Sequence, residues 1–226
     1  MTAVPKLALF DLDNTLLPFD SDHAWGEYCT QLGWVDGEQH RRANERFYAD
    51  YKAGRLDLPA YLRHALAPLV GRSATELQQA HAGFMRDIVV PRMHPQALQL
   101  VQRHQQAGDL CAIVTATNDF VTRPIADLFG VPKLIAVQTE RDANGALTGH
   151  WYGVPSFREG KIERTAQWLA ELGLGWQDFE QSWFYSDSIN DRALLEHVTH
   201  PVVVHPDPLL ADLARQRGWP VLELFS

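Results

Sequence analysis

The feature that most constrains the fold is an apolar run that ends abruptly in two carboxylates. Leu7–Phe10 runs directly into Asp11 and Asp13. Side chains two apart on an extended segment point the same way, so we expect both acidic groups to face one small site. Like charges held that close repel each other unless a cation or a shared proton neutralises them. The pair therefore predicts a nucleophilic carboxylate beside a proton-transferring carboxylate, both associated with a metal ion.

Composition limits the possible partners and the compartment. The chain has 226 residues, enough for one large domain or a core domain with a smaller insert, and a net charge of −8 argues against nucleic-acid binding. Cys29 and Cys111 lie in apolar runs, as buried thiols of a reducing compartment do. The first expected strand begins near residue 6, which leaves no room for a signal peptide, and no apolar run reaches membrane-spanning length. We expect a cytoplasmic protein with no nucleic-acid or membrane partner.

Periodicity divides the chain into a helical stretch and an alternating one. Residues 17–91 carry apolar positions at helical spacing, with a capping box at Ser73–Glu76, and predict a compact four-helix insert. From residue 96 onward, helices alternate with short buried strands at 110–115, 134–137, 183–185 and 202–204, and 142–145 is a hairpin turn signal. This alternation predicts an α/β fold with a doubly wound, mainly parallel sheet and helices on both faces.

Polar residues follow the expected strands where open parallel sheets bind ligands, beyond the carboxyl ends of the strands. Thr115 closes the expected strand 110–115, Asp187 and Asp191 follow the strand 183–185, and Lys161 begins a helix. Each has a structural alternative, such as a helix N-terminal carboxylate, a strand-end hydroxyl or a solvated lysine. Together with Asp11 and Asp13, the carboxylates favour a site for Mg²⁺ rather than zinc, because no His or Cys lies near them in the sequence.

In order and spacing, these residues resemble the four motifs of the haloacid dehalogenase (HAD) superfamily. The motifs are Asp11-Leu-Asp-Asn-Thr-Leu, Thr115 after an apolar strand, Lys161, and Ser-Asp187-Ser-Ile-Asn-Asp191. The resemblance implies a HAD-type Rossmann-like core of residues 1–16 and 92–226. It also implies a type C1 helical-bundle cap of residues 17–91. The four helices and the hairpin before Lys161 are most similar to subfamily IB, the phosphoserine phosphatase branch.

The resemblance also implies a role for each motif residue in an Mg²⁺-dependent phosphatase. Asp11 would attack phosphorus to form an aspartyl-phosphate, and Asp13 would protonate the leaving group and then activate water. Asp11, Asp13 through its backbone carbonyl, and Asp187 would bind Mg²⁺, with Asp191 holding a metal-bound water. The groups expected to bind the phosphoryl oxygens are Thr115, Ala116, Lys161 and Asn190. Dehalogenases of this family lack the second aspartate, so Asp13 favours phosphoryl chemistry.

Asp20 is the expected reader of the substrate's leaving group. It matches the position where phosphoserine phosphatases carry an acidic residue that holds an ammonium group, although it could equally be an ordinary helix start before Trp25. Ala65 stands where that family carries a carboxylate-gripping arginine, and Thr115-Ala116-Thr117 replaces its Ser-Gly-Gly. These departures favour a small phosphorylated metabolite with an amine and no carboxylate, such as histidinol phosphate, over phosphoserine.

Two alternatives to a phosphatase remain at this stage. A phosphotransferase would form the same aspartyl-phosphate and pass the phosphoryl group to another alcohol, which the sequence does not distinguish. A non-catalytic protein that binds a phosphorylated ligand is disfavoured because Asp11, Asp13, Lys161 and Asp187 are all present.

Overall fold

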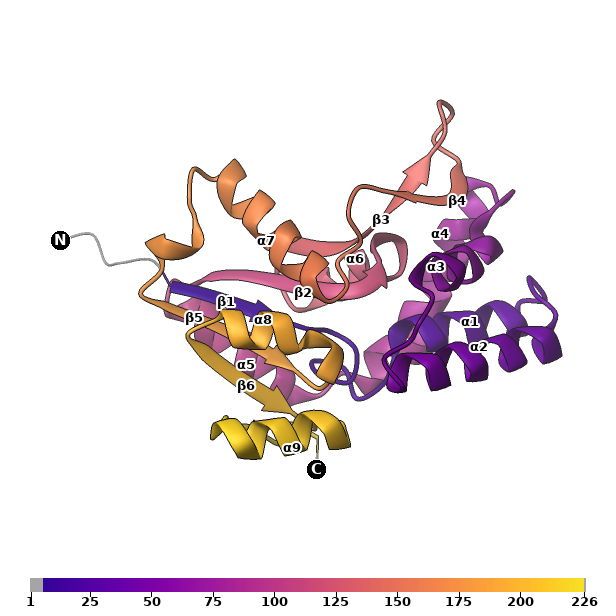
Figure 1. Cartoon of the computed structure of the whole chain (residues 1–226). Coiled ribbons are helices and arrows are strands. Elements are labelled where there is room, and N and C mark those ends of the chain that lie inside the picture. Colours follow the sequence, from indigo (N-terminus) through magenta and orange to yellow (C-terminus); the bar gives the residue numbers. More distant parts are fainter. Residues whose placement is uncertain (1–5, 226) are drawn as a thin grey trace. The chain divides into compact units, whose positions relative to one another are not determined.

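The chain divides into two units by its internal contacts. The computed structural model describes residues 6–225 (Figure 1), so residues 1–5 and 226, assigned by the prediction to the core domain, lie outside the described residues. The core unit comprises the residues up to Phe19, Arg92–Val137 and the residues from Val154 onward. The helical unit comprises Asp20–Pro91 together with Gln138–Gly153. The sequence prediction had assigned 138–153 to the core instead.

A seven-stranded sheet has the order β4-β3-β2-β1-β5-β6-β7. The strands are β1 Lys6–Phe10, β2 Leu110–Asn118, β3 Lys133–Arg141, β4 Leu147–Tyr152, β5 Gln181–Ser186, β6 His200–Val204 and β7 Val221–Leu222. Every pairing is parallel except that of β3 with β4. The chain moves outward from β1 in one direction and then in the other, so β1 lies at the topological switch point. The predicted doubly wound, mainly parallel α/β fold is confirmed.

The register of β1 and β2 creates a stepped edge beside β1. Phe10, the last residue of β1, pairs with Ile113 on one side and Tyr185 on the other. β2 continues to Asn118, where it pairs with Val137 after a register shift. The prediction that Thr115 closes the strand is therefore wrong, because the extended backbone persists for three more residues. The extra length carries the hydroxyls of Thr115 and Thr117 past the end of β1.

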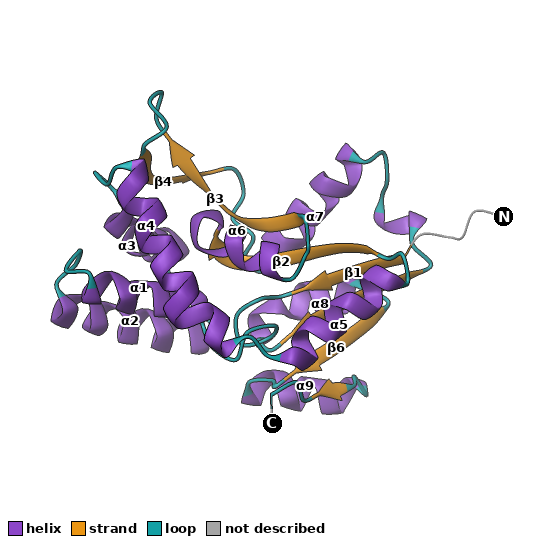
Figure 2. Ribbon diagram, turned by 180° about the vertical axis from the view of Figure 1, so that it is seen from behind, coloured by secondary structure: helices purple, strands orange, loops and turns teal. Residues whose placement is uncertain are grey.

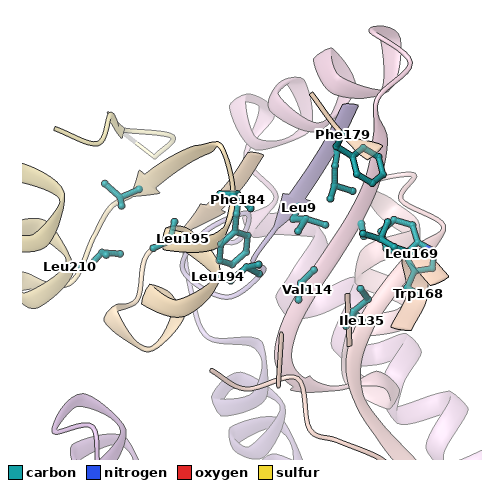
Figure 3. Packing of buried hydrophobic residues seen from close by; sticks show 14 of the residues in the cluster. Leu9, Val114, Ile135, Trp168, Leu169, Phe179, Phe184, Leu194, Leu195 and Leu210 are labelled. Atoms are coloured by element: carbon teal, nitrogen blue, oxygen red, sulfur yellow. The ribbon is translucent and has the colours of Figure 1, made fainter. Parts of the chain in front are cut away.

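Helices cover both faces of the core sheet. They are α5 Pro95–Gln106, α6 Asp119–Leu128, α7 Glu159–Glu171, α8 Arg192–His197 and α9 Pro208–Arg217. On one face, Leu9, Val114 and Ile135 from neighbouring strands form one cluster with Trp168 and Leu169 of α7 (Figure 3). On the other face, Phe10 stacks on Tyr185 and contacts His104 of α5 edge to face. Successive residues of β1 therefore pack into apolar layers on opposite faces of the sheet, as expected for a buried parallel strand.

The helical unit is built largely of helices (Figure 2). Its principal helices are α1 Ser21–Gln31, α2 Gly37–Lys52, α3 Leu58–Leu66 and α4 Ala74–Phe84. Before each helix, the side-chain oxygen of an N-cap residue accepts a hydrogen bond from a backbone N–H in the first turn. The N-cap residues are, in order, Asp20, Asp36, Asp57 and Ser73. The predicted capping box of Ser73 and Glu76 is present, and it satisfies two backbone donors that would otherwise lack partners. Trp25 of α1 packs edge to face on Phe84 of α4.

The β3–β4 hairpin belongs to the helical unit because β4 packs on α3 and on the short helix η1 (Ala67–Leu69). The predicted turn forms, with the Gly145 N–H donating to the carbonyl of Asp142. Gly149 has φ +81°, and a Cβ there would lie 2.6 Å from Val70, so glycine permits the close approach.

In the described part of the chain, no helix is long and apolar enough to cross a membrane.

A buried carboxyl links α1 to α3. Asp22 is 8% exposed and accepts a hydrogen bond from the Tyr61 hydroxyl. Burial raises the pKa of the Asp22 carboxyl from its ordinary 3.8 to about 7, and the nearby Asp20 raises it further while the Tyr61 bond opposes the shift. The folded chain therefore holds a proton on Asp22 in a pH range where the unfolded chain has lost it.

We expect Asp22 to make the folded state less stable as pH rises from about 4 to about 7. Because the folded state binds the extra proton, the free energy of unfolding falls across this interval by on the order of a few kcal/mol. Asp22→Asn, which stays neutral, should flatten that slope. Urea unfolding of both proteins at pH 5 and pH 8 measures the difference between the two slopes. Equal slopes would contradict the assignment.

Candidate active site

A buried chain of charges lies at the carboxyl end of the central strand. The Lys161 ammonium contacts Asp11 Oδ1 at 2.8 Å and Asp191 Oδ2 at 2.7 Å. Lys161 is 2% exposed, Asp11 7% and Asp191 4%. Asp11 follows β1, Lys161 lies in the first turn of α7, and Asp191 ends the short helix η5 (Ile189–Asp191) after β5. The structure thus gathers three predicted site residues from distant parts of the sequence.

The buried cluster contains more carboxyl groups than ammonium groups. Burial raises the pKa of the Asp11 carboxyl to about 6, and although Lys161 opposes the shift, the Asp191 charge adds to it. Burial also raises the pKa of Asp187, and Asp11 and Asp191 raise it further. Burial alone would lower the pKa of Lys161, but its two carboxylate partners hold it above its ordinary value. One ammonium therefore does not neutralise the surrounding carboxylates.

Thr15 joins Asp187 to Asp11. Its hydroxyl donates to Asp187 Oδ1 at 3.1 Å and lies 3.4 Å from Asp11 Oδ2, and the residue is fully buried. The prediction did not include Thr15 among the site residues. Its position two residues after Asp13, on the loop that leaves β1, is the signal that could have identified it.

Asp13 takes partners different from those of Asp11. Its Oδ2 accepts from the Thr117 hydroxyl at 2.8 Å and lies 3.5 Å from the Thr115 hydroxyl, so the carboxylate is held by the extended end of β2. The carbonyl of Thr115 accepts from the buried Ser156 hydroxyl at 2.5 Å, which ties β2 to the segment before Lys161. Ala116 lies between the two threonines and is half-buried. Residues 115–117, part of the predicted phosphate-binding site, are thus held by hydrogen bonds to both Asp13 and Ser156.

The loop after β5 carries the remaining predicted residues. The Ser186 hydroxyl donates to Asp191 Oδ2 at 2.6 Å, so Asp191 is held by both Ser186 and Lys161. Asn190 is 8% exposed, and its side-chain oxygen accepts from the Arg158 guanidinium at 3.0 and 3.2 Å. Neither Ser186 nor Arg158 is recognisable as a site residue from the sequence, since a single serine or arginine has no characteristic spacing.

Asp20 belongs to the helical unit and caps α1. Its carboxylate accepts the His23 backbone N–H at 2.9 Å, so the structural alternative considered for this residue does occur. That bond uses one carboxylate oxygen. A role in substrate recognition stays a prediction.

A divalent cation fits the chemistry of the core site. Among residues 6–225 no three Asp, Glu, His or Cys side chains gather with metal-binding geometry. The resemblance implies that a cation would be held by the two carboxylates of Asp11 and Asp187, with the Asp13 backbone carbonyl and water as its other ligands. Burial and neighbouring carboxylates raise the pKa of both carboxyls, a cation would favour their ionised forms, and the all-oxygen donor set suits Mg²⁺.

Comparisons with known proteins agree on one family. The family model for haloacid dehalogenase-like hydrolases matches residues 8–196. A histidinol-phosphatase of Neisseria meningitidis serogroup C is 46% identical over 96% of this chain and 98% of its own length. A phosphoserine phosphatase of Mycobacterium tuberculosis is 29% identical over 95% of this chain and 69% of its own length.

Solved structures give the same result for the fold. A Bordetella pertussis protein of unknown function is 47% identical, with a TM-score of 0.93 over 99% of this chain and 100% of that chain. A substrate-bound phosphoserine phosphatase is 18% identical, with a TM-score of 0.67 over 92% of this chain and 90% of that chain. The ordered motifs, the charge cluster beside β1 and the family match lead to one conclusion: the chain belongs to the haloacid dehalogenase-like hydrolase family.

Proposed function

We propose that this HAD-family phosphatase hydrolyses a small amine-bearing phosphomonoester, with histidinol phosphate as the leading candidate, through an aspartyl-phosphate on Asp11. The observation that carries the chemistry is the buried Asp11 carboxylate 2.8 Å from the Lys161 ammonium. The choice of substrate is supported by the 46% identity to a histidinol-phosphatase over nearly the full length of both chains.

In the first step the Asp11 carboxylate attacks phosphorus as the bond to the leaving oxygen breaks. Asp13 gives its proton to that oxygen, so the product leaves as a neutral alcohol. The hydroxyls of Thr117 and Thr115 hold the Asp13 carboxylate. Lys161 keeps buried Asp11 ionised and balances charge on the phosphoryl oxygens.

In the second step water attacks the phosphorus of the aspartyl-phosphate and Asp13 takes its proton. The bond to the Asp11 oxygen breaks, which releases inorganic phosphate and restores the carboxylate. Mg²⁺, when bound by Asp11, Asp187 and the Asp13 carbonyl, would supply positive charge that offsets repulsion between the carboxylates and the phosphate dianion.

Asp11→Asn should lower kcat by at least about a thousandfold, because the amide is not a nucleophile. The variant should still fold, since Lys161 keeps Asp191 as its partner. Phosphate release from histidinol phosphate, with the melting temperature as a check on folding, measures both effects. Asp212→Asn, which removes an exposed carboxylate of α9, is the matched control. A near-normal rate in Asp11→Asn would rule out the nucleophile assignment.

Removal of divalent cations with EDTA should abolish activity, and added Mg²⁺ should restore it. Calorimetric titration of the folded chain with Mg²⁺ measures binding without turnover. Asp187→Asn should weaken that binding at least about tenfold, because it removes one of the two expected carboxylate ligands. Unchanged Mg²⁺ affinity in this variant would contradict the proposed site.

The role of Asp20 can be separated from its helix cap. Asp20→Asn keeps an oxygen for the α1 N-terminus but removes the charge that would hold an ammonium group. We expect kcat/KM for histidinol phosphate to fall about tenfold or more relative to an amine-free ester such as p-nitrophenyl phosphate. Asp36→Asn, at the equivalent cap of α2, should leave that ratio unchanged. Equal slowing of both substrates in Asp20→Asn would refute the assignment.

A further inference from the structure

The turn before Lys161 has an arginine in a backbone position that favours glycine. The Gly160 N–H donates to the carbonyl of Phe157 at 3.0 Å, which closes a four-residue turn. Arg158 has φ 52° and ψ −124°, the geometry of the first central position of a type II′ turn. Glycine dominates that position because a Cβ is strained there. The strained turn is therefore retained despite a local cost.

Gly160 explains why the turn keeps its shape but not why Arg158 is present. A Cβ on Gly160 would lie 2.1 Å from the carbonyl oxygen of Pro155, so no larger residue fits at that position. The backbone of Arg158 also accepts the Lys161 N–H at 3.0 Å, which starts α7. Any residue, glycine included, could supply that carbonyl. The reason for arginine must come from its side chain.

The Arg158 side chain fixes the amide of Asn190. Its Nη2 and Nε both donate to Asn190 Oδ1, at 3.0 and 3.2 Å, and the guanidinium lies 4.9 Å from the Phe157 ring centre. A guanidinium has only donors, so it binds the oxygen end of the amide and turns the NH₂ end away from itself. The NH₂ end of Asn190 lies 3.4 Å from the Ser188 hydroxyl and, with two hydrogens, can also donate to a phosphoryl oxygen. The neighbouring Asp191 is bonded to Lys161, so the loop that Arg158 contacts also contributes to the charge cluster.

We propose that Arg158 is a positioning residue that holds the Asn190 amide with its donor end toward the phosphoryl group, and that the chain tolerates the strained turn for this purpose. The proposal rests on the assignment of Asn190 to phosphate binding. It makes a combined prediction that a purely structural arginine does not: removing the side chain stabilises the fold and weakens phosphate binding.

The test uses the full chain and the variants Arg158→Gly, Arg158→Lys and Asn190→Ala. Arg158→Gly should raise the melting temperature by about 2–4 °C, since glycine relieves the backbone strain. It should weaken binding of inorganic phosphate about tenfold, measured by calorimetry, and raise KM more than it lowers kcat. Arg158→Lys, which keeps a donor, should recover part of the loss. Arg164→Gln is the matched control, because Arg164 lies in α7, the helix that follows the turn, and donates to the carbonyl of Val154 at 2.9 Å.

A double-mutant cycle tests whether Arg158 acts through Asn190. The variant that combines Arg158→Gly with Asn190→Ala should bind phosphate no more weakly than Asn190→Ala alone, because Arg158 acts only through the Asn190 amide. Additive losses, or unchanged phosphate affinity in Arg158→Gly, would overturn the proposal. Phosphate titration requires no turnover. An active Asp11→Asn variant would refute the proposed hydrolytic mechanism, and that result is independent of the phosphate affinities measured here.

Discussion

The site depends on one buried ammonium between two buried carboxylates. Lys161 contacts Asp11 and Asp191 where all three are nearly inaccessible to water. Removing the Lys161 ammonium would leave two buried carboxylates without their cation, so the three residues must be positioned together. They come from the end of β1, the start of α7 and the loop after β5. The α/β topology meets this requirement, because β1 lies between β2 and β5 and the carboxyl ends of parallel strands share one edge of the sheet.

Residues without a formal charge set the geometry of this cluster. Thr15 donates to Asp187, Thr117 donates to Asp13, and Ser186 donates to Asp191. Each hydroxyl fixes one carboxylate oxygen and leaves the rest of that group for other partners. These neutral hydrogen bonds hold the acidic groups in distinct positions, although the carboxylates repel one another.

The sequence contains enough information for the fold class and the charged residues but not for their supports. Asp11, Asp13, Asp187 and Asp191 stand out because carboxylates after buried strands are costly without a function, whereas Lys161, at the start of a helix, is recognisable only in register with them. Thr15, Ser156 and Ser186 are ordinary in composition, and only the three-dimensional arrangement gives their hydroxyls specific partners. The length of β2 was underestimated because Ala116 and the flanking threonines are compatible with either strand or loop. The position of the hairpin was missed for a different reason: its contacts with α3 are long-range and leave no local pattern.

The assignment of the hairpin to the helical unit has a consequence for how the chain can be modified. The polypeptide passes between the two units at four points, at residues 19–20, 91–92, 137–138 and 153–154. The last of these leads within a few residues to the turn of Arg158 and to Lys161. A chimera that exchanges only residues 20–91 with a relative would separate α3 from the strand that packs on it. Exchange of substrate preference between relatives should therefore require two grafts, one for each segment of the helical unit.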